Sequence, residues 1–339
     1  MKRYLEILTK RQSLTYEEMK EATLQLFSEE VTDSEIAAFL IALKSKGETV
    51  DEVTGLIEVL LKQAHSFTSV TSGVMDNCGT GGDGSSSFNV STTAAFVIAG
   101  AGIKIAKHGN RSVSSKTGSA DVLEVLGSNL NLPKEVSQEL LNDIGITFLF
   151  APHVHPKLGQ IMKVRRSLKI PTIFNLIGPL TNPIALDYQL VGIYKRSYGP
   201  LFAKVLHRLG RKRAVVVNGA GFLDEASLQG ENYIALLDNG QIQEFEIRPE
   251  EIGLSSFSNS EIVGGDPMTN AAILQNVLRG KKGVYRDTVL FNAGLGIFAA
   301  EKAATVMEGI DLAKESIDSG RAYETLQQFI KRSKREGIK

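Results

Sequence analysis

The sequence predicts an α/β protein whose N-terminal part forms a separate, smaller helical domain. Residues 1 to about 66 carry apolar side chains at helical spacing, with no strand pattern between them. From about residue 74, short apolar runs alternate with helical stretches and glycine-rich turns, which is typical of βα units around a mostly parallel central sheet. We therefore expect a helical domain over residues 1–67, with a contribution from about 165–185, and an α/β domain over residues 68–339.

The N-terminal helices have recognisable start signals. Thr15, Thr32 and Thr49 are each followed three residues later by a glutamate. In this capping-box arrangement the two side chains satisfy the first free backbone N–H groups of a helix. Apolar residues recur at helical spacing behind each threonine, and Gly47 stands where the helix that follows Thr32 should end.

The larger domain shows alternating strand and helix patterns. The predicted strands are Val74–Asn77, Ile103–Ala106, Thr147–Phe150, Gln189–Tyr194 and Ala214–Asn218. Helices are expected near residues 91–101, 118–126, 134–144, 156–168 and 197–209. The region 230–260 alternates apolar and charged residues, which indicates strands at the edge of the sheet.

Composition and charge weigh against several classes of protein. Lys plus Arg total 38 and Asp plus Glu total 38, so no net positive charge attracts nucleic acid, and we expect no nucleic-acid partner. The single cysteine, Cys78, excludes an intrachain disulfide and suits a reducing compartment. The most apolar run, 94–102, is too short to span a bilayer, and the N-terminus lacks the apolar core of a signal peptide. We expect a cytoplasmic protein with no membrane partner.

A glycine-rich segment, NCGTGGDG at 77–84, joins a predicted strand to an almost wholly apolar helix. Its glycines allow backbone N–H groups to approach a ligand closely. Ser91 and Thr92 stand at the start of the following helix, where free N–H groups and the helix dipole favour an anion. The alternative is a flexible glycine turn. The segment matches neither the GxGxxG nor the GxxxxGK[ST] fingerprint.

A second loop, KHGNRSVSSKTGSAD at 107–121, lies between a predicted strand and a predicted helix. Its basic side chains, serines and glycines can surround phosphate oxygens, although a solvated basic loop is the alternative. Two anion-favouring loops on consecutive βα units indicate a diphosphorylated ligand. Further on, Asp224 and Glu225 follow an apolar strand, where adjacent carboxylates are suitable ligands for a hard cation. Such a dipeptide is more often solvated charge.

The runs CGTGGDG, FNVST, KHGNRSVSSKTGSADVLE and TIFNLIGPLTNP resemble the signature segments of anthranilate phosphoribosyltransferases. The resemblance extends from the helical N-terminal region through at least residue 300. It implies a nucleoside phosphorylase-like fold and the transfer of a 5-phosphoribosyl group from phosphoribosyl pyrophosphate (PRPP) to the anthranilate amine, in L-tryptophan biosynthesis. It also implies Mg²⁺, two ions per monomer, and a homodimer formed through the helical domain.

Matching positions carry expected roles over to this chain. The resemblance implies PRPP contacts from Gly79, Thr80, Gly81, Gly82, Asp83, Asn89, Ser91, Thr92, Lys107 and Ser119. It implies anthranilate contacts from Gly79, His108, Asn110, His155, Arg165 and Pro179. It implies metal ligands in Ser91, Asp224 and Glu225. No residue is expected to act as an acid or base, since Lys107 and Mg²⁺ can stabilise the developing charge.

Two of these assignments have a competitor in the sequence. Arg165 can pair its planar fork with both oxygens of a carboxylate, but its neighbour Arg166 can do the same. His153 is an alternative to His155 as the histidine that faces anthranilate.

The chain also departs from the usual family pattern before the acidic pair. Asn218 stands where a histidine is usual, and Gly221-Phe222 replaces the usual Asp-Gly. Two rival functions remain at this point: a pyrimidine nucleoside phosphorylase of the same fold, and a non-catalytic relative that binds nucleic acid.

Overall fold

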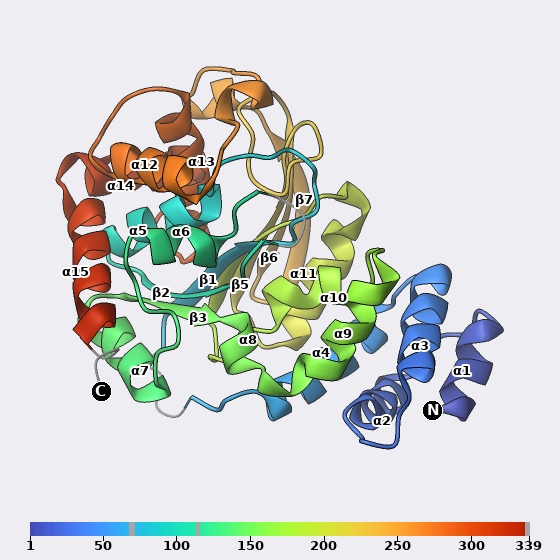
Figure 1. Cartoon of the computed structure of the whole chain (residues 1–339). Helices are drawn as coiled ribbons and strands as arrows, with labels where there is room; N and C mark the ends of the chain where they lie inside the picture. Colours follow the sequence, from blue (N-terminus) through green and yellow to red (C-terminus); the bar gives the residue numbers. More distant parts are fainter. Residues whose placement is uncertain (68–71, 113–115, 336–339) are drawn as a thin grey trace. The chain divides into compact units, whose positions relative to one another are not determined.

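The computed structural model describes residues 1–67, 72–112 and 116–335 of the chain (Figure 1). By internal contacts the chain divides into two compact units, residues 1–66 with 152–183, and residues 67–151 with 184–339. The second segment of the helical unit thus begins at residue 152, whereas the sequence predicts a contribution from about 165–185. The difference arises because the helix at 159–168 packs against the N-terminal helix at 33–46.

The helical unit is built from amphipathic helices that bury their apolar faces against one another. Its elements are α1 (Lys2–Thr9), α2 (Tyr16–Leu26), α3 (Asp33–Lys46), α4 (Val50–Gln63), α8 (Ala151–Val154, at the boundary), η1 (Pro156–Leu158), α9 (Gly159–Leu168), α10 (Ile173–Ile177) and η2 (Gly178–Leu180). Within the unit, α2 packs against α4, α1 against α3, and α10 against both α3 and α4.

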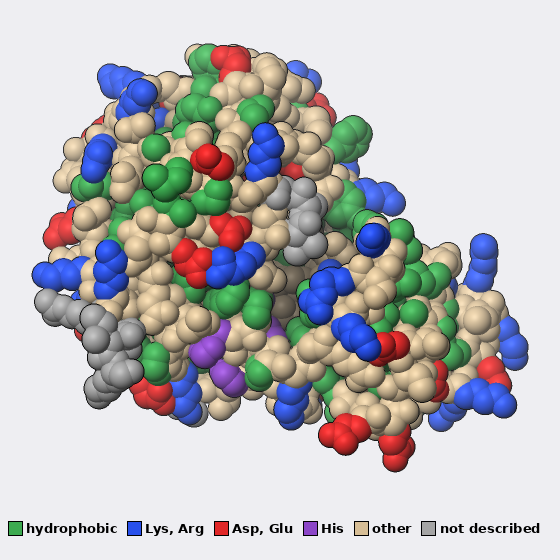
Figure 2. All heavy atoms as spheres, in the orientation of Figure 1, with side chains coloured by type: hydrophobic (Ala, Val, Ile, Leu, Met, Phe, Trp, Pro, Cys, Tyr) green, Lys and Arg blue, Asp and Glu red, His purple; other side chains and the backbone are tan. Residues whose placement is uncertain are grey.

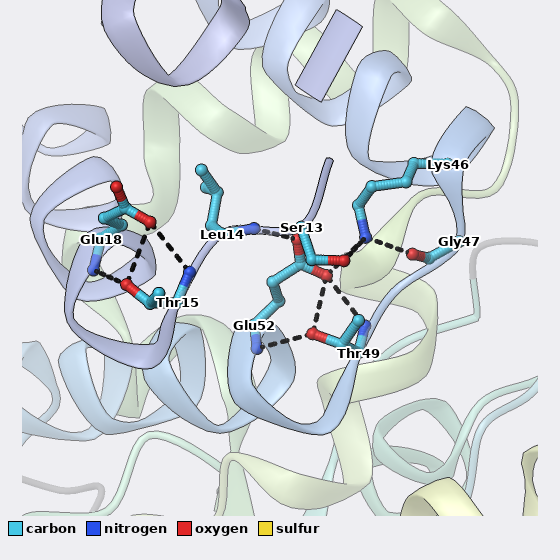
Figure 3. A network of polar contacts seen from close by, with 8 residues as sticks. All are labelled: Ser13, Leu14, Thr15, Glu18, Lys46, Gly47, Thr49 and Glu52. Carbon is cyan, nitrogen blue, oxygen red and sulfur yellow. Dashed lines mark hydrogen bonds and ion pairs between the residues drawn. The ribbon is translucent and has the colours of Figure 1, made fainter. Parts of the chain in front are cut away.

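Each predicted capping box is present in the helical unit. The hydroxyls of Thr15, Thr32 and Thr49 accept hydrogen bonds from the backbone N–H groups of the glutamates three residues later. Glu52 does more than cap α4, because its fully buried carboxylate also accepts from the Leu14 N–H at 2.9 Å and from Lys46 Nζ at 2.8 Å (Figure 3). One side chain therefore joins the start of α4 to the end of α3 and the approach to α2.

Over the described residues, the α/β unit contains one seven-stranded sheet of order β3-β2-β1-β4-β5-β6-β7. The strands are β1 (Val74–Gly79), β2 (Lys104–Gly109), β3 (Ile146–Phe150), β4 (Tyr188–Gly192), β5 (Arg213–Asn218), β6 (Asn232–Asp238) and β7 (Gln241–Ile247). The strands from β3 through β5 run parallel, whereas β6 and β7 are antiparallel additions. The mostly parallel sheet and the predicted edge strands are confirmed. After β7 the chain forms short 3₁₀ turns.

Helices pack around this sheet and bury its apolar side chains. They are α5 (Val90–Gly100), α6 (Ser119–Val125), α7 (Lys134–Asp143), η3 (Arg196–Tyr198), α11 (Gly199–Arg208), η4 (Pro249–Ile252), η5 (Asn259–Ile262), α12 (Pro267–Leu278), α13 (Val284–Ala299), α14 (Val306–Asp318) and α15 (Arg321–Arg335). The helix α5 is apolar on all sides because it packs against β1, β2 and the helices α12–α15 (Figure 1). None of the helices described is both long and apolar enough to cross a membrane.

The order of the parallel strands places a topological switch point between β1 and β4. The chain moves from β1 outward to β2 and β3, then returns to continue from β4 to β5 on the other side. Open α/β sheets bind ligands outside the carboxyl ends of the strands at such a point. Gly79 and Gly192, the last residues of β1 and β4, are direct register partners there.

Candidate active site

The carboxylate of Asp224 lies over the ends of β1 and β4. A Cβ atom added to Gly79 would stand 2.3 Å from Asp224 Oδ2, and one added to Gly192 would stand 1.6 Å from the Asp224 backbone oxygen. Both distances are far shorter than any real contact. The paired glycines therefore create the space that Asp224 occupies at the switch point, and a larger residue at either position would displace it.

The glycine-rich loop after β1 wraps around the same carboxylate. Gly81 donates its backbone N–H to Asp224 Oδ2 at 2.6 Å, and the Asp224 N–H points to Asp83 Oδ2 at 3.5 Å. Gly81 and Gly82 have φ values of 68° and 81°, the left-handed region that glycine adopts without strain. The hydroxyl oxygen of Thr80 is buried without a hydrogen-bond partner among the described residues. It is thus a polar atom available to a ligand.

The start of α5 and the buried Lys107 approach Glu225. Ser91 donates its backbone N–H to Glu225 Oε1 at 3.1 Å, and Lys107 Nζ donates to Ser91 Oγ at 3.2 Å. Lys107 also donates to the backbone oxygen of Asn77 at 2.5 Å, and its residue is only 2% exposed. The predicted metal ligands and the cationic side chain of Lys107 therefore lie together in the α/β unit.

Asn77, the first residue of the glycine-rich segment, is a member of this group to which the sequence assigned no role of its own. Its Nδ2 donates to the Ser91 backbone oxygen at 2.8 Å, while its buried Oδ1 has no partner among the residues described. The available signal was a polar side chain inside a strand that is otherwise buried, directly before the glycine-rich loop. Asn77 therefore contacts Lys107 through its backbone oxygen and Ser91 through its side-chain amide.

The carboxylates of Asp224 and Glu225 are buried close together, which makes their ionised forms unfavourable. Burial, then the nearby charges of Asp83 and Glu225, raise the pKa of Asp224 well above its usual range. Burial also raises the pKa of Glu225 to about 7, although Lys107 and the Ser91 N–H act in the opposite direction. A bound divalent cation would relieve this cost, since it compensates both desolvation and repulsion.

The oxygen donors at this position suit Mg²⁺ better than a cation that needs a complete protein cage. In the described part of the chain, no three or more His, Cys, Asp or Glu side chains are grouped as a metal site. Mg²⁺ is usually bound through one or two carboxylates, with phosphate oxygens and water completing its shell. Asp224, Glu225 and the Ser91 hydroxyl fit that kind of site.

The second predicted anion loop is anchored to the start of α5. Thr92 Oγ1 donates to Ser119 Oγ at 2.9 Å, and Asn89 Nδ2 donates to the Thr117 backbone oxygen at 3.2 Å. Of the predicted phosphate cradle, residues 113–115 lie outside the described part of the chain. Arg111 is directed away from a phosphate role, because its guanidinium pairs with two carboxylates on α6, those of Asp121 and Glu124.

Two of the residues expected to bind anthranilate lie at the end of β2, one within the strand and one directly after it. His108 is buried in β2, and its backbone N–H donates to Asp76 Oδ1 at 3.1 Å. Asn110 is exposed, and its side-chain oxygen accepts from the Arg111 N–H at 2.7 Å. Both belong to the α/β unit, as does Gly79.

The other residues expected at anthranilate belong to the helical unit. His155 is buried, and its Nε2–H donates to the backbone oxygen of Thr181 at 2.8 Å; burial lowers the pKa of this imidazole. The alternative, His153, is half-buried and packs edge to face on His65, with ring centroids 5.5 Å apart. Pro179 is buried in η2.

Arg165 and Arg166 differ in their surroundings. Arg165 donates to Asn175 Oδ1 at 3.2 Å and its guanidinium lies 5.3 Å from the centre of the Phe174 ring. Burial lowers the pKa of Arg165, whereas Arg166 is exposed. The residues at 172–175 therefore orient Arg165, and among the described residues no comparable contact is found for Arg166.

The departures from the family pattern lie just before the acidic pair. Asn218, the last residue of β5, donates from Nδ2 to the Ile193 backbone oxygen at 2.7 Å. Phe222 has a φ of 64° and is 71% exposed, which is unusual for a large aromatic residue. The turn is closed by an antiparallel bridge between Gly219 and Leu223. The changed residues thus leave Asp224 and Glu225 at the strand ends.

Family models match both parts of the chain. The model described as "Glycosyl transferase family, a/b domain" matches residues 71–323, and the one described as "Glycosyl transferase family, helical bundle domain" matches residues 2–64. Among curated proteins, the anthranilate phosphoribosyltransferases of Bacillus cereus (strain AH820) and Bacillus anthracis (strain A0248) are each 57% identical over 336 residues, covering 99% of this chain and 98% of the relative.

Solved structures agree with these matches. Anthranilate phosphoribosyltransferase from Thermus thermophilus superposes with a TM-score of 0.92 at 37% identity, over 97% of this chain and 99% of that one. The enzyme from Saccharomyces cerevisiae in complex with PRPP and Mg gives a TM-score of 0.89 at 28% identity, over 98% and 97% of the two chains. The sequence, the fold and the residues at the switch point therefore lead to one assignment: the chain belongs to the anthranilate phosphoribosyltransferase family.

Proposed function

We propose that this chain transfers the 5-phosphoribosyl group from PRPP to the amine of anthranilate, giving N-(5-phosphoribosyl)anthranilate and pyrophosphate, in L-tryptophan biosynthesis. The observation that carries the proposal is the arrangement around the acidic pair at the switch point. There Gly81 donates to Asp224, Ser91 donates to Glu225, and Lys107 donates to the Ser91 hydroxyl. This is the set of donors, cation and carboxylates that a metal-bound diphosphate requires.

Mg²⁺ is the cation we propose for this site, held by Asp224, Glu225 and Ser91, with two ions per monomer. When bound, it supplies charge neutralisation at the leaving pyrophosphate. Support comes from the raised pKa values of the two carboxylates, which a cation would relieve. Related yeast structures contain PRPP and Mg, or Mg in a Ser121Ala variant.

The chain's own groups would bind and orient PRPP. We expect phosphate and ribose contacts from Gly79, Thr80, Gly81, Gly82, Asp83, Asn89, Ser91, Thr92, Lys107 and Ser119. The ammonium of Lys107 would stabilise negative charge that develops on the leaving group. Its hydrogen bonds to Asn77 and Ser91 hold it in place within a buried setting.

The transfer itself needs positioning rather than acid–base chemistry. The anthranilate nitrogen uses its lone pair to form the bond to C1′, while the C1′–O bond to pyrophosphate breaks and pyrophosphate keeps that electron pair. The amine then loses a proton to solvent. We expect a direct displacement with inversion at C1′. A trapped ribosyl-enzyme adduct would contradict this route.

Anthranilate binding is assigned to Gly79, His108, Asn110, His155, Arg165 and Pro179. Arg165 is proposed to pair with the anthranilate carboxylate, because its fork-shaped guanidinium can meet both oxygens. The side chain is supported by Asn175 and Phe174, which favours it over the exposed Arg166. A yeast member of the family is known in complex with 4-fluoroanthranilate.

The assembly and location follow from the same proposal. We infer a homodimer formed through the helical unit and a cytoplasmic enzyme, the latter supported by the single cysteine of the chain. Light scattering coupled to size-exclusion chromatography tests the dimer, for which a monomeric mass would be contrary evidence.

The rival functions predict different activities. A pyrimidine nucleoside phosphorylase would cleave thymidine or uridine with inorganic phosphate, whereas the proposed enzyme would not. A nucleic-acid-binding relative needs a concentrated positive surface. On the face shown in Figure 2, Lys and Arg side chains are interspersed with Asp and Glu rather than gathered. Mass spectrometry of the product formed from PRPP and anthranilate, run beside the phosphorolysis assay, decides between the enzymes.

A further inference from the structure

Hydrogen bonds close a ring among Asn89, Thr117, Gly265 and Asn270 in the α/β unit. Asn89 Nδ2 donates to the Thr117 backbone oxygen at 3.2 Å, and Thr117 Oγ1 donates to the Gly265 backbone oxygen at 2.8 Å. Gly265 N–H donates to Asn270 Oδ1 at 2.7 Å, and Asn270 Nδ2 donates back to Asn89 Oδ1 at 2.9 Å. The ring joins the residue before α5, the end of the second anion loop and the first turns of α12.

The backbone groups in this ring fix how both amides are oriented. A carbonyl oxygen can only accept, so the Asn89 atom that faces Thr117 must be the nitrogen. A backbone N–H can only donate, so the Asn270 atom that faces Gly265 must be the oxygen. The remaining atoms then meet as a donor on Asn270 and an acceptor on Asn89, which is the pairing observed. The two constraints are independent and they agree.

The ring determines what Asn89 can offer to a ligand. Its Oδ1 is occupied by Asn270, and its Nδ2 uses one hydrogen on Thr117. Across residues 1–67, 72–112 and 116–335, the second Nδ2 hydrogen has no hydrogen-bond partner. Asn89 is the N-cap of α5, two residues before Ser91. It therefore presents a donor, suited to a phosphate or ribose oxygen, where free N–H groups also favour an anion.

The partner that sets this orientation is itself shielded from water. Asn270 is only 2% exposed, so solvent cannot readily replace its side chain in the ring. The packing next to it is equally tight, because a Cβ atom on Gly264 would stand 2.7 Å from Asn270 Oδ1 and 2.8 Å from the Phe88 Cα. Without Asn270, the Asn89 amide would lose the donor that holds its Oδ1, and only its hydrogen bond to the Thr117 backbone oxygen would restrain it.

We propose that Asn270 is a positioning residue for PRPP binding: it holds the Asn89 amide with its N–H directed at the substrate. Asn270 acts through Asn89 and does not itself contact PRPP. The inference rests on the proposed function, because it takes PRPP as the ligand of Asn89.

A double-mutant cycle measured by calorimetry tests this inference. The four proteins are the wild type, Asn270→Ala, Asn89→Ala and the double variant, each titrated with PRPP in the presence of Mg²⁺. Asn270→Ala should weaken PRPP binding about fivefold to tenfold, the worth of one neutral hydrogen bond. In the Asn89→Ala background, the same change should add less than about twofold, because its target is gone. The KM for anthranilate should stay within about twofold of the wild-type value.

A buried asparagine outside the ring provides the matched control. Asn232 holds the backbone of Ser227 through both atoms of its amide and is fully buried. Asn232→Ala should lower thermal stability, as should Asn270→Ala, but it should bind PRPP like the wild type. Should Asn270→Ala not fold, Asn270→Asp keeps the acceptor for Gly265 and loses the donor to Asn89, so the same cycle can be completed.

The outcomes separate the two proposals. Wild-type protein that binds no PRPP would overturn the proposed function and this role with it. Wild-type binding combined with effects that multiply in the double variant would overturn the positioning role alone. An equal loss of affinity in Asn232→Ala would do the same, because it would assign the effect to general loosening.

Discussion

Glu225 accepts a hydrogen bond from the backbone N–H of Ser91 at 3.1 Å, although 134 residues separate them in the sequence. The bond joins the acidic pair to the first turn of α5, where the helix dipole favours a negative charge. Even so, burial raises the pKa of Glu225 to about 7. The Ser91 N–H and Lys107 therefore do not offset the cost of burying this carboxylate, which is the property expected of a carboxylate that binds a cation.

Replacing the acidic pair separates catalysis from folding. Asp224→Asn with Glu225→Gln should lower Mg²⁺-dependent turnover about a hundredfold or more, because the metal loses its anionic ligands. Thermal stability without Mg²⁺ should be equal or higher, since neutral amides avoid the burial of charge. The matched control is Asp311→Asn with Glu315→Gln on the exposed side of α14, which should be fully active. An active Asp224/Glu225 variant would remove the metal assignment.

The glycine at the end of β4 should be intolerant of a side chain. Gly192→Ala places a Cβ atom 1.6 Å from the Asp224 backbone oxygen, so the acidic pair must move. We expect a loss of about 2 kcal/mol or more in the free energy of unfolding, together with a large loss of turnover. Gly230→Ala is the control, because its nearest neighbour is an Ala220 Cβ at 3.7 Å. Chemical denaturation and activity that are unchanged in Gly192→Ala would contradict the packing described.

The proposed pairing of Arg165 with the anthranilate carboxylate is tested by comparing this residue with its neighbour Arg166. Arg165→Ala should raise the KM for anthranilate about tenfold or more, because a charge-assisted pair is lost. The KM for PRPP should change much less. Arg166→Ala, which removes an exposed side chain, should change neither value. Equal increases in both KM values for Arg165→Ala would instead indicate a structural role.

His155 should make stability depend on pH. Burial lowers the pKa of its imidazole below the ordinary 6.5, so the unfolded chain takes up a proton at a higher pH than the folded chain. The stabilisation by neutral His155 is therefore present above 6.5 and is lost as the pH falls through the folded-state pKa.

Urea unfolding at about pH 7.5 and about pH 5.5 measures this effect. The loss of stability at the lower pH should be smaller in His155→Gln than in the wild type. His207→Gln, at an exposed position on α11, serves as the control and should keep the wild-type loss. An undiminished loss in His155→Gln would show that another group is responsible.

Local patterns in the sequence predict the capped helices of the helical unit and the strands of the sheet, whereas the helices α12–α15 were not predicted. Thr15, Thr32 and Thr49 mark helix starts because a capping box involves only neighbouring residues. The parallel strands and the edge hairpin follow from apolar periodicity. The boundary at residue 152 was missed, because it depends on how α9 packs against α3 rather than on local signals.

The roles of individual site residues needed the register of the sheet and long-range contacts. Gly192 matters because it is the partner of Gly79 in neighbouring strands, and this pairing cannot be read from either segment alone. Asn270 lies 181 residues from the amide that it orients. Arg111 lies in a loop whose composition suits phosphate binding, but its guanidinium forms ion pairs with two carboxylates of α6.

The most direct test of the central claim follows the native fluorescence of anthranilate in a mixture with PRPP, Mg²⁺ and the purified protein. We predict a loss of fluorescence that requires all of these components and stops when EDTA is added. Folded wild-type protein that leaves the fluorescence unchanged would contradict it, and the glycine-rich loops would then serve another acceptor.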